Sequence, residues 1–174
     1  MNGGKDRKDK KSTQWVEVDN LLLVAKERLP SAFSKNAQAK WQKEIQQARI
    51  LSERGHKVCL VGESGRGKHY DALVDGRKTE MKTVTGNVNA IGKNFRRAMK
   101  QATDVFLRIK TQNITVHRAY SKLVGTVKAM LENGYTFTQD RVIYVWLDSE
   151  GILSKWDVDE IIQSAMLIIK EKRW

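Results

Sequence analysis

The stretch from Tyr70 to Val84 reads YDALVDGRKTEMKTV and decides the fold. Two short runs with strand-like alternation flank Asp75-Gly76, the two-residue loop that most strongly indicates a β-hairpin, because both turn positions need positive φ. Counting outwards from these loop residues places Asp71 directly opposite Glu80. The stretch therefore predicts a tight antiparallel hairpin with two carboxylates facing each other.

The side-chain period of two divides this hairpin into two faces. One resembles a core and carries Ala72, Val74, Thr79 and Met81, while the other carries Asp71, Leu73, Lys78, Glu80 and Lys82. Opposed carboxylates repel at a cost of about 0.2–1 kcal/mol, and folding alone gives no reason to accept that cost. A bound Mg²⁺ or Mn²⁺ would make this arrangement of two carboxylates favourable instead of unfavourable. Lys82 could orient a water or stabilise negative charge on a phosphate. The alternative is a solvated face with scattered charges.

Asp71, followed after eight residues by Glu80-Met81-Lys82, resembles the D…(D/E)xK core of the PD-(D/E)xK nuclease superfamily. The sequence from Asp71 to Thr83 is most similar to that of nuclease toxin domains at the C-termini of contact-dependent growth inhibition and related polymorphic toxin proteins. The resemblance runs from about Lys40 to about Trp156, and Tyr70 stands where the superfamily has proline. It implies a restriction-endonuclease-like α/β domain, with a central mixed sheet flanked by helices.

The resemblance also implies an activity, the metal-dependent hydrolysis of phosphodiester bonds in RNA, tRNA in particular. Asp71 and Glu80 would hold one or two divalent cations, helped by Glu44 or Glu63, since similar toxins carry an acidic residue near the metal at one or other position. Lys82 would position the attacking water or stabilise the pentacoordinate phosphate. Oxygen ligands without a His or Cys cluster favour Mg²⁺ or Mn²⁺ over Zn²⁺.

Two other functions stay open. The D…ExK core does not distinguish RNA from DNA, so the same chemistry on DNA is one alternative. The other is an inert basic module that binds nucleic acid or serves phage assembly. The chain has 32 Lys and Arg against 20 Asp and Glu, a formal charge of +12 and a pI near 9.9, which favours polyanionic partners. Ribosome-associated and membrane-surface proteins share that balance.

The basic residues form two candidate nucleic-acid contacts. The segment Asn87 to Thr103 predicts an amphipathic helix whose cations lie largely away from its apolar stripe: Lys93, Arg96, Arg97 and Lys100. Similar nucleases place the helix after the ExK strand against the substrate backbone, and Gln101 stands where some of them have a site-supporting Gln or Lys. A solvated basic helix face is the alternative.

The second basic candidate is the glycine-rich segment Gly62 to His69, which reads GESGRGKH and nearly spells the phosphate-binding loop GxxxxGK[ST]. His69 lacks the hydroxyl that ligates magnesium, and a hairpin follows where the motif requires a helix. Both departures argue against a nucleotide triphosphatase. Arg66 and Lys68 then fit either a phosphate clamp beside Asp71 or a plain flexible connection.

The remaining chain predicts one domain. We expect residues 1–17 to form a basic flexible tail or linker and residues 18–174 a single nuclease-like domain, with a short helix over Val18–Leu29 and an amphipathic helix over Ala37–Arg54. The order helix, strand, hairpin, helix, strand, helix, strand is typical of an α/β sheet with helices on its faces. The one cysteine, Cys59, permits no internal disulfide.

Partner and location follow from the resemblance. A nuclease toxin must be neutralised where it is made, so we expect an acidic cognate immunity protein alongside the nucleic acid. The domain would be delivered from a secreted parent protein and act in the target-cell cytoplasm; without such a parent it would be cytoplasmic. The sequence has no apolar run of ~18 residues and no signal-peptide core, so we expect no membrane segment in it.

Overall fold

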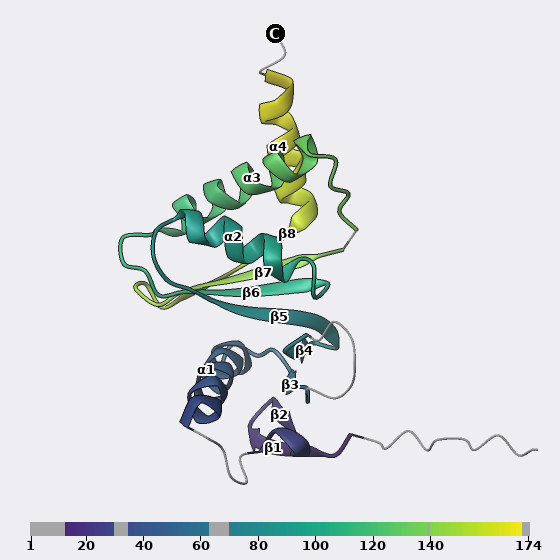
Figure 1. Cartoon of the computed structure of the whole chain (residues 1–174), viewed down its shortest axis with the longest axis vertical. Coiled ribbons are helices and arrows are strands. Elements are labelled where there is room, and N and C mark those ends of the chain that lie inside the picture. Colours follow the sequence, from purple (N-terminus) through teal and green to yellow (C-terminus); the bar gives the residue numbers. More distant parts are fainter. Residues whose placement is uncertain (1–12, 30–34, 63–69, 139, 172–174) are drawn as a thin grey trace, which may run out of the picture.

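The computed structural model describes residues 13–29, 35–62, 70–138 and 140–171 (Figure 1). Its strands form one eight-stranded sheet, in which spatial order follows sequence order: β1 (Trp15–Asp19), β2 (Leu22–Ala25), β3 (Val58–Leu60), β4 (Ala72–Val74), β5 (Arg77–Val84), β6 (Asp104–Ile109), β7 (Val142–Leu147) and β8 (Ile152–Asp157). The pairs β2/β3, β5/β6 and β6/β7 are parallel, and the other neighbouring pairs are antiparallel. The predicted mixed sheet is confirmed.

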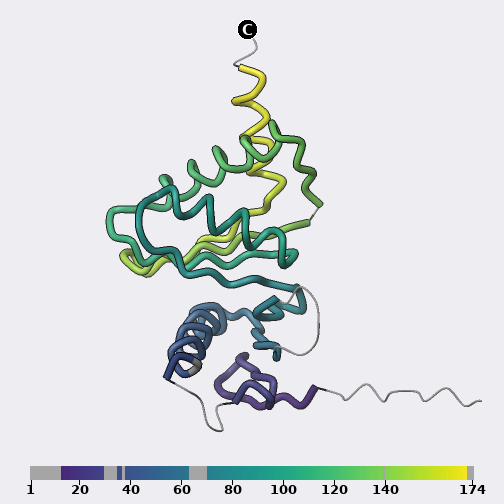
Figure 2. Tube along the Cα trace, viewed as in Figure 1, coloured from purple at the N-terminus to yellow at the C-terminus, as the bar shows by residue number. Residues whose placement is uncertain are grey.

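Helices cover both faces of this sheet, which curls between β5 and β1 (Figures 1 and 2). They are α1 (Lys35–Ser52), α2 (Asn89–Ala98), α3 (Val116–Glu132) and α4 (Val158–Glu171), with a short 3₁₀ helix η1 (Lys26–Arg28) after β2. Strand alternation separates two cores. Val105, Leu107 and Ile109 of β6 pack with α2, α3 and α4, whereas Phe106 packs in the core that α1 closes. The α/β class is therefore confirmed, while the restriction-endonuclease-like fold stays a prediction.

The hairpin has the predicted register. Ala72 pairs with Thr79 and Val74 with Arg77, which places Asp71 across from Glu80. Both turn residues have positive φ, 50° at Asp75 and 81° at Gly76, the backbone that Asp-Gly favours in a two-residue loop. The Asp75 carboxylate also accepts hydrogen bonds from the Lys57 N–H (2.9 Å) and from Nδ1 of His56 (2.7 Å), so the turn is tied to the start of β3.

The helix predicted over Val18–Leu29 is wrong. This segment completes β1, turns at Asn20-Leu21, where Leu21 has φ 62°, and continues as β2 and η1. Leu22 and Val24 are fully buried two residues apart, so a strand period accounts for them better than a helical one. β1 begins at Trp15, and residues 15–17 of the expected tail therefore belong to the sheet.

Candidate functional site

The candidate metal site lies on one face of β5. Met81 packs in the α1 core, and the Thr83 hydroxyl accepts a hydrogen bond from Gln47 of α1 (3.3 Å). Val84 packs instead with α2 and α3. Because side chains alternate along a strand, Glu80 and Lys82 project to the α2 side, away from α1.

Three of the predicted site residues are brought together here. One Asp71 oxygen, Oδ2, accepts a hydrogen bond from the Met81 N–H (2.8 Å), which holds this carboxylate against β5. Lys82 Nζ forms an ion pair with Glu80 Oε1. Glu80 is only 2% exposed, and its second oxygen, Oε2, is buried with no hydrogen-bond donor among the described residues. A buried carboxylate oxygen without a partner costs free energy, so this atom needs an explanation.

Electrostatics add to that cost. Burial raises the pKa of Glu80 above its ordinary value, and the neighbouring Asp71 carboxyl raises it further, while the hydrogen bond from Lys82 opposes both effects. Two carboxyl groups thus share one partly desolvated region, in which Lys82 pairs with Glu80 Oε1. Such an arrangement can hold a cation, because a positive ion would give Oε2 a partner and offset the repulsion.

The number of protein ligands limits which cation fits. Among the described residues, no three His, Cys, Asp or Glu side chains gather closely enough to hold a metal. A structural zinc site requires four protein ligands, whereas Mg²⁺ usually keeps several waters and is held by one or two carboxylates plus substrate phosphate. Asp71 and Glu80 provide the one or two carboxylates that a hydrated magnesium-type ion uses.

The structure places only one of the two candidates for a third carboxylate, Glu44. Glu44 is 8% exposed on α1, where its carboxylate lies 3.0 Å from Arg28 Nη1 and 3.9 Å from Lys40 Nζ. Because α1 covers the other face of the sheet, the structure does not bring Glu44 to Glu80 and Lys82. Glu63 lies outside the described residues, as do the two loop cations Arg66 and Lys68.

The basic residues of α2 line a groove of about 660 Å³ against the end of α3. Its lining comprises Lys93, Arg96, Arg97, Lys100, Ala129, Met130, Asn133, Gly134 and Tyr135. The sequence predicted the cations but missed the α3 side, although Asn133-Gly134 is recognisable as a helix end. Gln101 is exposed just beyond α2 and does not line the groove.

This groove and the carboxylate pair share one face and one end of the sheet. α2 follows β5 and leads into β6, which is parallel to β5, so α2 runs back over the sheet towards the start of both strands. Glu80 pairs with Val105 near that end. The C-terminal part of α2 therefore lies towards the Glu80 end of the site face.

Comparisons with known proteins bear on the fold. No protein-family model and no curated protein matches the sequence. The structure is similar to a chain of the "CdiA-CT/CdiI toxin and immunity complex" from Burkholderia pseudomallei, with a TM-score of 0.53 and 17% identity over 74% of this chain and 92% of that chain. The chain thus has a fold like that of one component of this toxin and immunity complex.

No helix among the described residues is long and apolar enough to cross a membrane.

Proposed function

We propose that this protein is a nuclease toxin of the contact-dependent growth inhibition type, a divalent-metal-dependent endonuclease that hydrolyses RNA, with tRNA as the substrate. The observation that carries the proposal is the cluster of Asp71, Glu80 and Lys82, in which a buried Glu80 oxygen has no donor. The similar complex consists of a toxin and an immunity protein. A charge of +12 favours the toxin role, because a surface of that sign attracts a polyanionic substrate.

The chemistry divides between the ion and the chain. A bound Mg²⁺ or Mn²⁺ would polarise the phosphodiester and lower the pKa of an attacking water. Asp71 and Glu80 would hold the ion, and the backbone hydrogen bond to Asp71 would keep one carboxylate oriented without further reorganisation. The Lys82 ammonium forms an ion pair with Glu80 in this structure. With substrate bound, it would stabilise the negative charge that develops on the phosphate.

Incubation of the purified protein with total RNA, tRNA and plasmid tests this proposal. We expect tRNA to be cleaved with MgCl₂ or MnCl₂ and to remain intact with EDTA, because Asp71 and Glu80 act through the ion. If no nucleic acid is degraded with either metal, the inert binding module becomes the better explanation. Plasmid cleavage at protein concentrations that leave tRNA intact would replace the RNA substrate by DNA.

The proposed toxin role also implies a partner, an acidic immunity protein, and a place of action. The toxin would act in the cytoplasm of the target cell, and the immunity protein would cover its basic groove. We expect the complex with a small acidic product of the neighbouring open reading frame to weaken between 0.1 M and 1 M salt, because the Debye length falls from about 10 Å to about 3 Å. Titration calorimetry at both salt concentrations measures this. Affinity that does not change with salt would exclude a mainly electrostatic interface.

A further inference from the structure

The four cations of the α2 groove lack an acidic partner in the part of the chain that the structure describes. Lys93, Arg96, Arg97 and Lys100 are exposed, and within the described part of the chain none of them forms an ion pair with Asp or Glu. Like charges three or four residues apart destabilise a helix by about 0.2–0.5 kcal/mol per pair. The helix dipole favours cations in the last turn, which covers Arg96 and Arg97 but leaves Lys93 unexplained. A bound polyanion would remove the repulsion along the whole row.

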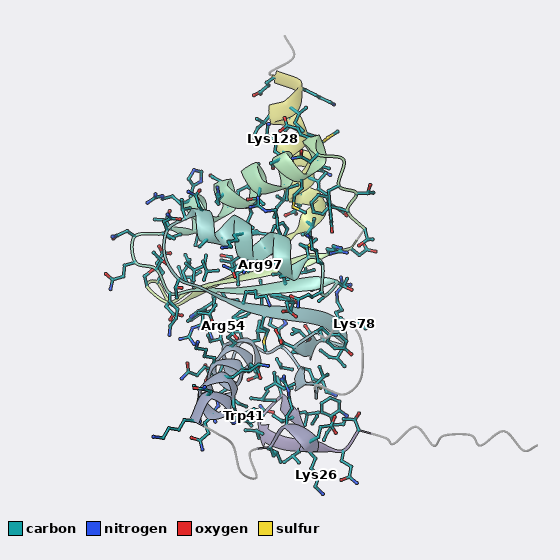
Figure 3. All side chains as sticks on the ribbon, viewed as in Figure 1. Lys26, Trp41, Arg54, Lys78, Arg97 and Lys128 are labelled. Atoms are coloured by element: carbon teal, nitrogen blue, oxygen red, sulfur yellow. The ribbon has the colours of Figure 1, made fainter. Side chains whose placement is uncertain are left out.

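Close packing of the two helices forms the groove. Gly92 of α2 lies against the Thr126 side chain of α3, where any Cβ would collide with the threonine hydroxyl. The Thr126 hydroxyl in turn donates to the Lys122 carbonyl (2.8 Å). This contact fixes the distance between the helices, so the α2 cations and the end of α3 face a groove of defined width. Figure 3 shows Arg97 on α2, far from Lys26, the first residue of η1.

The opposite wall carries a rigidly held aromatic ring. Gly134, with φ 77°, ends α3, its N–H donating to the Leu131 carbonyl (2.9 Å) while the Tyr135 N–H donates to that of Met130 (2.9 Å). These two bonds form a Schellman cap. The Tyr135 ring also packs edge-to-face on Phe137, with ring centroids 4.8 Å apart. Backbone and ring contacts together therefore hold Tyr135 at the groove, where its ring needs little ordering on binding.

We infer that this groove binds an unpaired stretch of nucleic acid, with phosphates on the α2 cations and one base stacked on Tyr135. The inference rests on the proposed function and narrows its substrate to one with accessible single-stranded bases. Lys93 to Arg97 span about 6 Å of α2, enough for adjacent phosphates, and Lys100 lies in the turn that follows the helix. A duplex would present phosphates to this row but no base face, because its bases are stacked inside, whereas unpaired bases stack on aromatic side chains.

The binding experiment uses the wild-type protein in EDTA, so that cleavage does not interfere. Labelled oligouridylate and an RNA duplex with the same number of phosphates are titrated by fluorescence anisotropy. Tyr135→Leu keeps an apolar side chain on the Phe137 contact but removes the ring, so we expect affinity for oligouridylate to fall by about 5- to 150-fold and affinity for the duplex to stay unchanged. Tyr135→Phe keeps the ring and should bind like wild type.

The cations provide a second, independent readout. Arg97→Gln should weaken binding of both RNAs and reduce the salt slope of log K by about 1. The matched control, Lys26→Gln, removes the same charge from an exposed lysine of η1, whose ammonium donates a hydrogen bond to the Gln14 side chain before β1. It should leave both affinities and the salt slope unchanged.

Two results would overturn the inference: Tyr135→Leu that binds oligouridylate like wild type, or equal losses of affinity for oligouridylate and duplex. The outcome is separate from that of the proposed function. Cleavage without a Tyr135 effect would refute only the stacking role, and Tyr135-dependent binding without cleavage under any metal would refute only the nuclease.

Discussion

Glu80→Gln is expected to reduce metal-dependent cleavage at least ~100-fold and, in EDTA at neutral pH, to raise the melting temperature. The loss of activity follows because an ion that contributes several kcal/mol of transition-state stabilisation would lose its buried carboxylate. The gain in stability follows because Gln removes a desolvated charge beside Asp71, and its amide could donate to that carboxylate.

The pH dependence of this stability has a definite sign. The pKa of Glu80 is raised from 4.5 in the folded protein by burial and by Asp71. Between 4.5 and the raised pKa, the folded state binds more protons than the unfolded state, so stability falls as pH rises through that interval. The melting advantage of Glu80→Gln in EDTA should therefore shrink as the pH is lowered from neutral through that interval, and it should be smallest below 4.5. Thermal melts at acid and neutral pH measure it.

Two further variants separate catalysis from folding. Lys82→Met should also be inactive, yet less stable than wild type in EDTA, because it leaves the Glu80 carboxylate without its ion pair. Glu150→Gln removes an exposed carboxylate in the turn after β7 and should change neither activity nor stability. A Glu80→Gln protein that melts well below wild type in EDTA would instead assign the carboxylate a structural role.

The hairpin was predictable because its information is local. Asp75-Gly76 sets the turn, and the turn sets the register that brings Asp71 across from Glu80. The anchoring of Asp71 was not predictable, since its bond to the Met81 N–H depends on how the chain enters β4. Asp71→Asn is consequently a better inactivating change than Asp71→Ala, because the amide oxygen can still accept that bond.

Features that depend on distant segments were missed. Glu44 lies on a helix whose amphipathic pattern is clear, but the pattern does not say which face of the sheet the helix covers. Tyr135 reaches the groove only because α2 and α3 pack at Gly92 and Thr126. Residues Val18–Leu29 were mistaken for a helix because consecutive leucines satisfy either period over so short a span.

The ion pair between Asp104 and Arg77, which no sequence pattern predicted, has the largest expected effect on stability. Asp104 is fully buried at the start of β6, where its oxygens accept bonds from Arg77 Nε (2.5 Å) and Nη2 (2.9 Å) of β5. Oδ1 also accepts a bond from the Val142 N–H of β7 (3.0 Å). One carboxylate therefore joins three neighbouring strands, beside the pairing of Thr79 with Asp104 that precedes Glu80.

Asp104→Ala is expected to lower the free energy of unfolding by about 1–3 kcal/mol, because it leaves the Arg77 Nε–H and the buried Val142 N–H without their acceptor. Urea unfolding gives the change directly. Glu132→Ala provides the matched control: it removes a carboxylate from the surface pair with Lys128 on α3 and should cost only about 0.3–0.5 kcal/mol. Asp104→Asn should fall between the two, since its amide oxygen can still accept from Val142 while the charge on Arg77 goes unmatched. A cost below about 1 kcal/mol for Asp104→Ala would mean that water reaches the site and replaces the carboxylate, and the three strands would then be held by their backbone ladders and core packing alone.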